Sequence, residues 1–317
     1  MTPTQLTAYA AVVRLGSVKE AARELEVTEA AVSMHVARLR KELDDQLFTR
    51  TYSGLAFTPG GLRLASRATE ILGLQNRTVL EVGQAGRGRR LLRMASTALF
   101  AEHAAPGLIE LFANRAKDLD VELSVRPADQ FEPALASREV DVAIGPRPPT
   151  SGLDCRTFLN FKIHVVAGPE HPLANIPVVP GQLADQPWLL GPSAVGSAGG
   201  FGAMLDRLNI AESRQRIFQS DAAAIEETKR ANGISLGVGF VVADDLAAGR
   251  LVKITGPGME EIGSWTAMAL GQQSDPAAPA AELLRFITTP RATQAMLRGS
   301  GVNIGRFRPS VYVTLWS

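Results

Sequence analysis

The segment GSVKEAARELEVTEAAVSMHVARL, residues 16–39, has the pattern of two short helices separated by a tight turn. Ser17 opens the first helix with the motif SVKE. This motif predicts a capping box, in which the Ser17 hydroxyl accepts a hydrogen bond from the amide of Glu20 and the Glu20 side chain reaches back. After a turn of about four residues, Thr28 is well suited to cap the second helix. Two short helices joined in this way form a helix-turn-helix.

The second helix has two different faces. A stripe that is predicted to pack in the core recurs at spacings of 4, 3 and 4 residues: Val32, Val36, Leu39 and Leu43. The opposite face carries small or basic side chains: Ala30, Ser33, Met34, Ala37, Arg38 and Lys41. Small side chains would let the backbone approach the floor of a groove, and the Ser33 hydroxyl could bond a phosphate or a base edge. A solvated helix with helix-favouring alanines would show the same periodicity, so both interpretations stay open at this point.

The next segment, QLFTRTYSGLAFTPGG (46–61), has two short apolar runs on either side of a turn at Tyr52, Ser53 and Gly54. This pattern predicts a small hairpin, or wing, directly after the helix-turn-helix. The combination with the two helices favours a surface that touches a large partner over a merely solvated face.

A long helix should begin at Thr58 and Pro59 and run to about Val82. One side of it is rich in apolar residues: Leu62, Ala65, Ile71, Leu72, Val79, Leu80 and Val82. Because such a side is unfavourable in water, we expect the helix to pair with its copy in a second subunit. GQAGRGRR at 83–90 then breaks the helix and predicts a flexible hinge.

Residues 91–317 alternate between strand and helix patterns. LLRMAST, LDVELSVR and DVAIG are predicted strands, and PGLIELFANRA and FEPALASREV lie between them as predicted helices. The pattern restarts at FKIHVVAG and DQPWLLG and returns in ELLRFITTPRATQAMLRG, which reads as one late helix. We therefore expect two α/β subdomains that are joined by crossing strands, with a cleft between them. The alternating tail SVYVTLW predicts a terminal strand.

These features together resemble the LysR-type transcriptional regulators. The front motif is the most specific part, with its run of small residues, Ala-Val-Ser at 31–33, Leu-Phe-x-Arg at 47–50 and Phe-Thr-x-x-Gly at 57–61. HPLA at 171–174, ANGISLGVGFV at 231–241 and GRLVKI at 249–254 match later segments in the right order.

The resemblance implies three parts. Residues 1–58 would form an all-α winged helix-turn-helix, residues 59–90 a linker and dimerisation helix with its hinge, and residues 91–317 an effector-binding domain similar to periplasmic binding proteins. It also implies a dimer or tetramer that binds imperfect inverted repeats in double-stranded DNA, with the helix that begins at Thr28 in the major groove.

Carried over to this sequence, the DNA-contact candidates are Thr28, Glu29, Ala30, Ser33, Met34, Arg38 and Arg50. Some positions depart from the common pattern: Gln-Pro is usual where this chain has Glu29–Ala30, a basic residue is frequent at Met34, and Arg is frequent at Ser53. Glu29 cannot donate to adenine as Gln can, but it could accept from cytosine N4. These departures should change the preferred DNA sequence.

The resemblance also implies a small-molecule effector, and the strand ends supply candidate contacts: Ser96, Thr97, Gln130, Phe131, Arg147 and Ser197. Thr97 follows the first strand of the domain, where a hydroxyl beside helix amides would suit a carboxylate or phosphate, which favours an anionic effector. Capping or loop hydrogen bonding is the alternative role for each of these residues.

Composition and motifs argue against enzymes, metals and membranes. The lone Cys155 excludes an internal disulfide and a CxxC knuckle, and the spacing of His35, His103, His164 and His171 is unlike a metal site. No P-loop, GxSxG or full GxGxxG motif occurs, and we expect no cofactor. The absence of a signal peptide and of a long apolar run predicts a cytoplasmic protein.

Charge is unevenly divided along the chain. Residues 1–90 hold 13 basic and 9 acidic residues, a difference of +4, whereas the remainder holds 20 and 23, a difference of −3. A basic front end favours a polyanionic partner. Two alternatives stay open: an architectural DNA-binding protein whose C-terminal domain only oligomerises, and a solute-binding or enzymatic C-terminal domain.

Overall fold

The computed structural model describes residues 1–51, 54–86, 88–148, 152–194, 200–271, 278–297 and 313–314. The chain divides into two compact units, Met1–Arg87 with Ala136–Glu139, and Gly88–Leu135 with Val140–Ser317.

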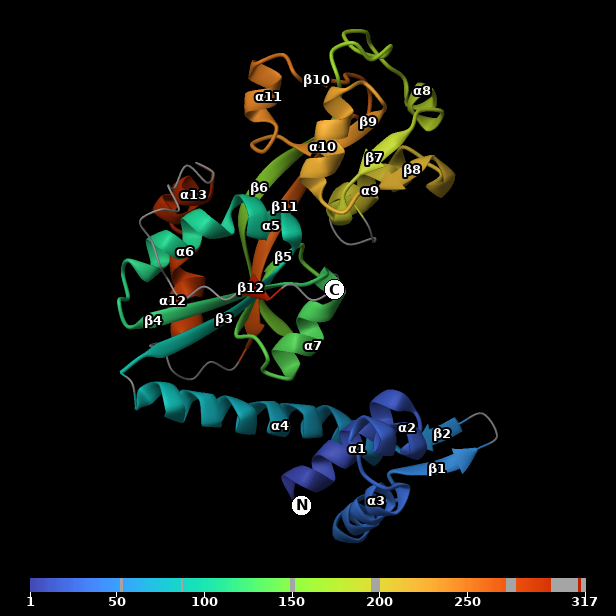
Figure 1. Ribbon diagram of the computed structural model, residues 1–317, viewed down its shortest axis with the longest axis vertical. Helices are drawn as coiled ribbons and strands as arrows, with labels where there is room; N and C mark the ends of the chain where they lie inside the picture. The colour runs from blue at the N-terminus through green and yellow to red at the C-terminus, as the bar shows by residue number, and fades with distance from the viewer. Residues whose placement is uncertain are drawn as a thin grey trace. The chain divides into compact units, whose positions relative to one another are not determined.

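The first unit is a winged helix-turn-helix followed by a long helix (Figure 1). Its elements are α1 (Pro3–Leu15), α2 (Val18–Glu24), α3 (Glu29–Leu43), β1 (Phe48–Thr51), β2 (Gly54–Phe57) and α4 (Pro59–Ala85). The antiparallel wing pairs Phe48 with Phe57 and Thr51 with Gly54, as the apolar runs predict. The predicted turn residues Tyr52 and Ser53 lie outside the described residues.

Side-chain caps fix where these helices begin. The Thr28 hydroxyl accepts from the Ala31 amide at 3.1 Å, and the Ser17 hydroxyl accepts from the Glu20 amide at 3.3 Å. Only half of the predicted Ser17 capping box forms, because the Glu20 carboxylate accepts from Arg23 at 2.7 Å instead. A full capping box stands at Thr2, where the sequence analysis did not place one.

The core of this unit confirms three of the four positions in the predicted stripe. Val32, Val36 and Leu39 are buried, but Leu43 is 41% exposed. Leu43 is the last residue of α3, and Asp44 then adopts a left-handed conformation that turns the chain away. Leu47 fills the core at that end instead, with a φ of 62° and no exposed surface.

The second unit is built on one mixed sheet with the strand order β12-β4-β3-β5-β11-β6-β9-β7-β8, and β10 pairs with β6. Its strands are β3 (Arg90–Ser96), β4 (Leu119–Val125), β5 (Val142–Gly145), β6 (Leu153–Ala167), β7 (Trp188–Leu190), β8 (Gln215–Ile217), β9 (Ile234–Val238), β10 (Val252–Lys253), β11 (Glu260–Leu270) and β12 (Val313–Thr314). Its α-helices are α5 (Ala98–His103), α6 (Ala105–Ala113), α7 (Phe131–Ala136), α8 (Pro180–Ala184), α9 (Gly200–Arg207), α10 (Asp221–Lys229), α11 (Ala243–Ala247), α12 (Pro279–Phe286) and α13 (Pro290–Leu297), and its short 3-10 turns are η1 (Ala128–Gln130), η2 (Pro192–Ala194) and η3 (Glu212–Arg214).

Two long antiparallel strands, β6 and β11, join the two subdomains of this unit (Figure 1). They pair from Leu153 with Leu270 to His164 with Glu260, and the register shifts between Trp265 and Thr266. These are the crossing strands that the sequence predicts, although β6 starts well before the apolar run at Phe161 that indicated it.

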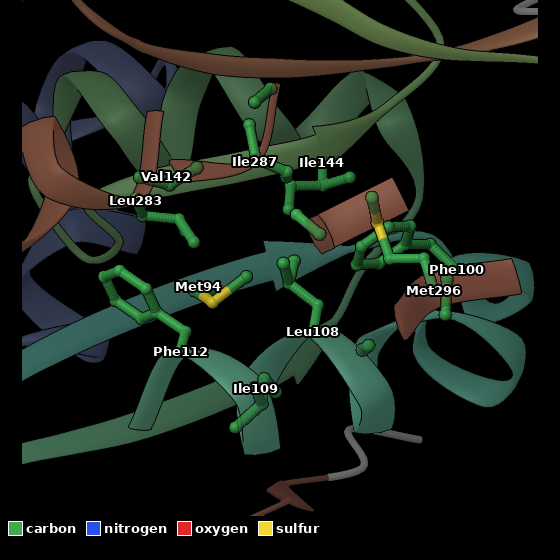
Figure 2. Packing of buried hydrophobic residues seen from close by; sticks show 14 of the residues in the cluster. Met94, Phe100, Leu108, Ile109, Phe112, Val142, Ile144, Leu283, Ile287 and Met296 are labelled. Atoms are coloured by element: carbon green, nitrogen blue, oxygen red, sulfur yellow. The ribbon is translucent and has the colours of Figure 1, made fainter. Parts of the chain in front are cut away.

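Each subdomain has its own apolar core. The first subdomain packs α5, α6, α12 and α13 against β3 and β5, where side chains such as Met94, Phe100, Leu108, Ile144 and Leu283 interlock (Figure 2). The second packs α8 and α9 against β6, β7 and β9 around Trp188, which has no exposed surface.

The prediction of a single late helix is wrong. Two helices, α12 and α13, occupy this region, because Pro290 cannot continue α12 and Thr289 caps α13 by accepting from the Ala292 amide at 3.3 Å. The predicted terminal strand is present in part, since Val313 and Thr314 pair in parallel with Leu123 and Ser124 of β4.

Candidate functional sites

The outer face of α3 is solvent-exposed along its length. All of the candidate residues on α3 and the wing are exposed: Thr28, Glu29, Ala30, Ser33, Met34, Arg38 and Arg50. Small side chains at Ala30 and Ser33 leave the first turns of α3 unobstructed. This shape lets the backbone approach a groove, as a recognition helix does.

Two cations of this surface are available for a partner. Within the described residues, neither Arg38 nor Arg50 forms an ion pair, whereas Arg14 pairs with Glu24 and Arg23 with Glu20. An unpaired guanidinium on an exposed helix or wing can neutralise a phosphate without first breaking an internal contact.

The wing is held to α3 by residues that the sequence analysis missed. The Arg40 guanidinium donates to the carbonyls of Gln46 and Phe48 at 2.6 and 2.7 Å and lies over the Phe48 ring at 4.6 Å. The Asp45 carboxylate accepts from the Leu47 amide at 2.6 Å and from the Thr58 hydroxyl at 2.7 Å, and these bonds lower the pKa of Asp45. The sequence signal for this turn is the pair Asp44–Asp45 directly after α3, because a short carboxylate can accept from the amide two residues on.

Several effector candidates gather at one edge of the sheet in the second unit. The parallel strands β4, β3 and β5 end side by side, with Ser96 beside Val125 and Ile144. Ser96 and Thr97 therefore lie near the segments that hold Gln130 and Arg147, which are both exposed. The Ser96 hydroxyl is buried without a hydrogen-bond partner, and Thr97 makes no capping bond to α5.

Phe131 has a packing position at this edge. It is 2% exposed, and its ring lies so close to Gly145 that a Cβ there would come within 2.6 Å of it. The last candidate, Ser197, lies outside the described residues.

A cavity of about 190 Å³ lies between the two subdomains. Leu99 and His103 of α5 form one wall, and α10, β9 and the start of α11 form the others. Its polar lining includes Asp221, whose carboxylate accepts from the Ser193 hydroxyl at 2.6 Å and the Ser193 amide at 3.3 Å. The sequence analysis missed this residue, since an acid at the start of a helix is an ordinary capping signal.

Burial shifts the acid–base groups around this cavity. It raises the pKa of Asp221 and lowers the pKa of His103. The pKa of Glu102 is also raised, first by burial and then by the negative charge of Asp221. By contrast, Lys229 contacts Glu226 at 2.6 Å and Asp245 at 2.8 Å, so its charge is compensated.

The four histidines do not gather into a metal site. Among the described residues, no group of three or more His, Cys, Asp or Glu side chains is arranged to hold a metal ion. His171 is a buried loop residue whose Nδ1 accepts from the Leu173 amide at 3.2 Å, as its loop position predicts. Of the helices in the described ranges, none has both the length and the apolar character that a bilayer crossing requires.

Family comparisons agree with this architecture. Residues 3–62 match the bacterial regulatory helix-turn-helix protein, lysR family, and residues 85–289 match the LysR substrate binding domain. An exposed reading helix with a wing, followed by a two-subdomain ligand-binding fold, defines a ligand-responsive transcriptional regulator. The chain belongs to the LysR family of transcriptional regulators.

Individual relatives span most or all of the chain. An "uncharacterized HTH-type transcriptional regulator" of Mycobacterium tuberculosis (strain H37Rv) is 59% identical over 322 residues, covering 100% of both chains. The HTH-type transcriptional regulator CbbR of Cereibacter sphaeroides is 28% identical over 270 residues, covering 82% of this chain and 85% of that protein.

Solved structures show the same fold. ArgP from Mycobacterium tuberculosis has a TM-score of 0.59 at 19% identity and covers 90% of this chain and 97% of its own. Full-length BenM has a TM-score of 0.51 at 20% identity, with 90% and 96% covered.

Proposed function

We propose that this protein is a sequence-specific regulator of transcription that reads an inverted-repeat operator in double-stranded DNA and is controlled by a small-molecule effector. The observation that supports the DNA-binding surface is the exposed, small-residue face of the capped helix α3, flanked by Arg38 and Arg50, which form no ion pair with any residue that the structure describes. Residues 1–58 read DNA, residues 59–90 link and dimerise, and residues 91–317 sense the effector. The protein has no catalytic role, and it works in the cytoplasm, where its DNA lies.

The proposed surface has two kinds of residue: those that read the base sequence and those that bind the phosphate backbone. Thr28, Glu29, Ala30, Ser33 and Met34 face base edges in the major groove, whereas Arg38 and Arg50 contact phosphates. Glu29 favours a cytosine at its contact position, because a carboxylate accepts from cytosine N4 and cannot donate to adenine.

The DNA surface is tested by binding a mapped operator over a salt series. Arg50→Ala should weaken binding to all sequences and reduce the slope of log K against log salt by about 1. Ser33→Glu should abolish specific binding, since it places a carboxylate against the DNA. Lys117→Ala, which removes an exposed cation of the second unit, is the matched control and should bind as wild type. Wild-type affinity in both test variants would place the reading surface elsewhere.

The effector acts by shifting a conformational population. A ligand held between the subdomains contacts both, so it favours the arrangement in which the subdomains are closed. Ser96, Thr97, Gln130 and Arg147 line its approach at the sheet edge, Phe131 supports them, and Ser197 joins them. In the oligomer, closure changes how the DNA-reading heads are presented. An effector that binds but leaves operator affinity, DNA bend and transcription unchanged would contradict this step.

A further inference from the structure

The cavity between α5 and α10 has an apolar wall and one polar end. Leu99 belongs to the first subdomain, and Ile225, Leu236 and Val238 belong to the second. Its volume of about 190 Å³ equals that of about six water molecules in the liquid. This is enough room for a small organic molecule with a short hydrocarbon part.

The charges of the lining are not balanced. Among the described residues, Asp221 receives side-chain hydrogen bonds from Ser193 alone, and both donors are neutral. Across the cavity lies His103, whose pKa is lowered by burial although the negative charge of Asp221 acts in the opposite direction. Lys229 cannot serve as the counter-ion, because Glu226 and Asp245 already compensate it.

A second acid, Glu102, lies on the opposite side beside His103, with its Oε2 3.8 Å from the His103 Nε2, and is not part of the cavity lining. Glu102 belongs to α5, and the negative charge of Asp221 disfavours its ionised form. The two carboxyl groups come from different subdomains, and the charge of Asp221 acts on Glu102. A buried carboxylate without a counter-ion is costly, and a bound cation removes that cost.

From this arrangement we propose that the cavity between α5 and α10 binds a small organic cation, an alkylammonium or alkylguanidinium, whose head group pairs with Asp221 and whose hydrocarbon part lies on Leu99, Ile225 and Leu236. The inference rests on the proposed function, because it names the class of effector that the cleft selects. None of the sheet-edge candidates Ser96, Thr97, Gln130 and Arg147 lines this cavity, so the cation binds at a different place from the anion expected at Thr97. The ligand touches both subdomains, so its binding is coupled to their closure.

The test uses the full chain and four probes of similar size: n-butylguanidinium, n-butylammonium, butyrate and n-butanol. Calorimetry and thermal unfolding at pH 7.5 measure binding. The two cations should bind and raise the melting temperature in proportion to the logarithm of their concentration, and butyrate and butanol should not.

Variants assign the binding to this cavity. Asp221→Asn keeps the side-chain shape and should weaken cation binding about thirty-fold or more. Ala222→Leu leaves all charges in place and should block binding by filling the cavity. Asp206→Asn removes one exposed carboxylate of α9 outside the lining and should bind as wild type.

The outcomes separate this inference from the proposed function. Preferred binding of butyrate, or cation binding that is unchanged in both Asp221→Asn and Ala222→Leu, overturns the inference. Operator binding measured with each probe then tests the regulator itself. Cation binding that depends on Asp221 but leaves operator affinity, DNA bend and transcription unchanged supports the site and overturns its role as the effector site.

Discussion

At the scale of single residues, Tyr9 connects α1 to the start of α4. Its ring has no exposed surface, and its hydroxyl donates to the Gly61 carbonyl at 2.9 Å. Burial, and after it the charge of Asp45, raises the pKa of Tyr9 to about 12. The neutral phenol is therefore part of the folded DNA-binding unit.

The first prediction concerns alkaline stability. Because the folded pKa of Tyr9 is raised, its contribution is fully present below the unfolded pKa of about 10 and is lost as the pH rises through about 12. The loss is on the order of 2–3 kcal/mol. Tyr9→Phe should cost about 1 kcal/mol at pH 8. Urea unfolding between pH 8 and 12 measures both, and the difference in stability should shrink and then change sign at high pH, because the loss in wild type exceeds the about 1 kcal/mol that Tyr9→Phe costs. A difference in stability that stays constant over this pH range would show that the pKa of Tyr9 is the same in the folded and unfolded states.

Two glycines of α4 give the second prediction. A Cβ on Gly61 would lie 2.0 Å from the Leu47 carbonyl oxygen, whereas a Cβ on Gly83 meets nothing within 4 Å. Gly61→Ala should cost more than about 2 kcal/mol, since backbone must shift. Gly83→Ala should stabilise by about 0.5–1 kcal/mol, because alanine loses less backbone entropy in a helix. Urea midpoints measure both changes in stability. If Gly61→Ala did not destabilise the protein, the packing at Gly61 would be loose.

Single residues also mark the limit of periodicity. The 3.6-residue repeat predicts Leu43 in the core as firmly as Val36, because it cannot register the left-handed turn at Asp44. Leu47 takes the position after that turn. Asp221 was missed for a related reason: its importance depends on which side chains of another subdomain face it.

At the scale of elements, α4 has more apolar surface than a lone helix in water favours. Leu62, Ile71, Leu74, Val79, Leu80 and Val82 are 41–68% exposed. Five of them are residues of the predicted apolar side, but Leu62 and Leu80 lie opposite the arc of Ile71, Leu74, Val79 and Val82, which is the basis for the proposed pairing with a second copy.

The third prediction tests that pairing. Val79→Glu places a charge in the apolar arc formed by Ile71, Val79 and Val82, where an apposed helix would bury it. It should lower the mass of the particle measured by light scattering at micromolar concentration. Ser66→Glu adds the same charge on the polar side of α4 and should leave the mass unchanged. An unaltered mass in Val79→Glu would move the oligomer interface to another surface.

Elements were predictable where a local signal marks both ends. Thr58–Pro59 correctly indicated the start of α4. The Thr58 hydroxyl accepts from the Gly61 amide at 2.8 Å. The same dipeptide at Thr289–Pro290 does not stand out as a helix start, because apolar residues continue on both sides of it. The full length of β6 was not predictable, since its first half is partly exposed and carries mixed side chains.

At the scale of the whole molecule, the two units have separate apolar cores. The fourth prediction is that thermal unfolding occurs in two calorimetric transitions. Tyr9→Phe should lower only one of them. Leu108→Ala, in the core of the second unit, should lower only the other, at a cost of about 2–5 kcal/mol. A single transition that both variants shift equally would mean that the units unfold together.

The overall architecture followed from the sequence because each unit has a strong local pattern: two capped helices with a wing, and alternating strands and helices. The cleft chemistry did not, because it depends on contacts between α5 and α10, whose residues are more than a hundred positions apart.

The ladder of β6 and β11 has a consequence for how the gene can be edited. The chain leaves the first subdomain along β6 and comes back along β11. At this crossing His164 pairs with Glu260, and the Val165 amide donates to the Met259 carbonyl at 3.2 Å. The second subdomain is thus an insertion whose two ends are adjacent. One contiguous stretch of codons between those ends could be exchanged for that of a relative, which would transplant half of the ligand cleft while leaving the native sequence of the DNA-reading head and of both segments of the first subdomain unchanged.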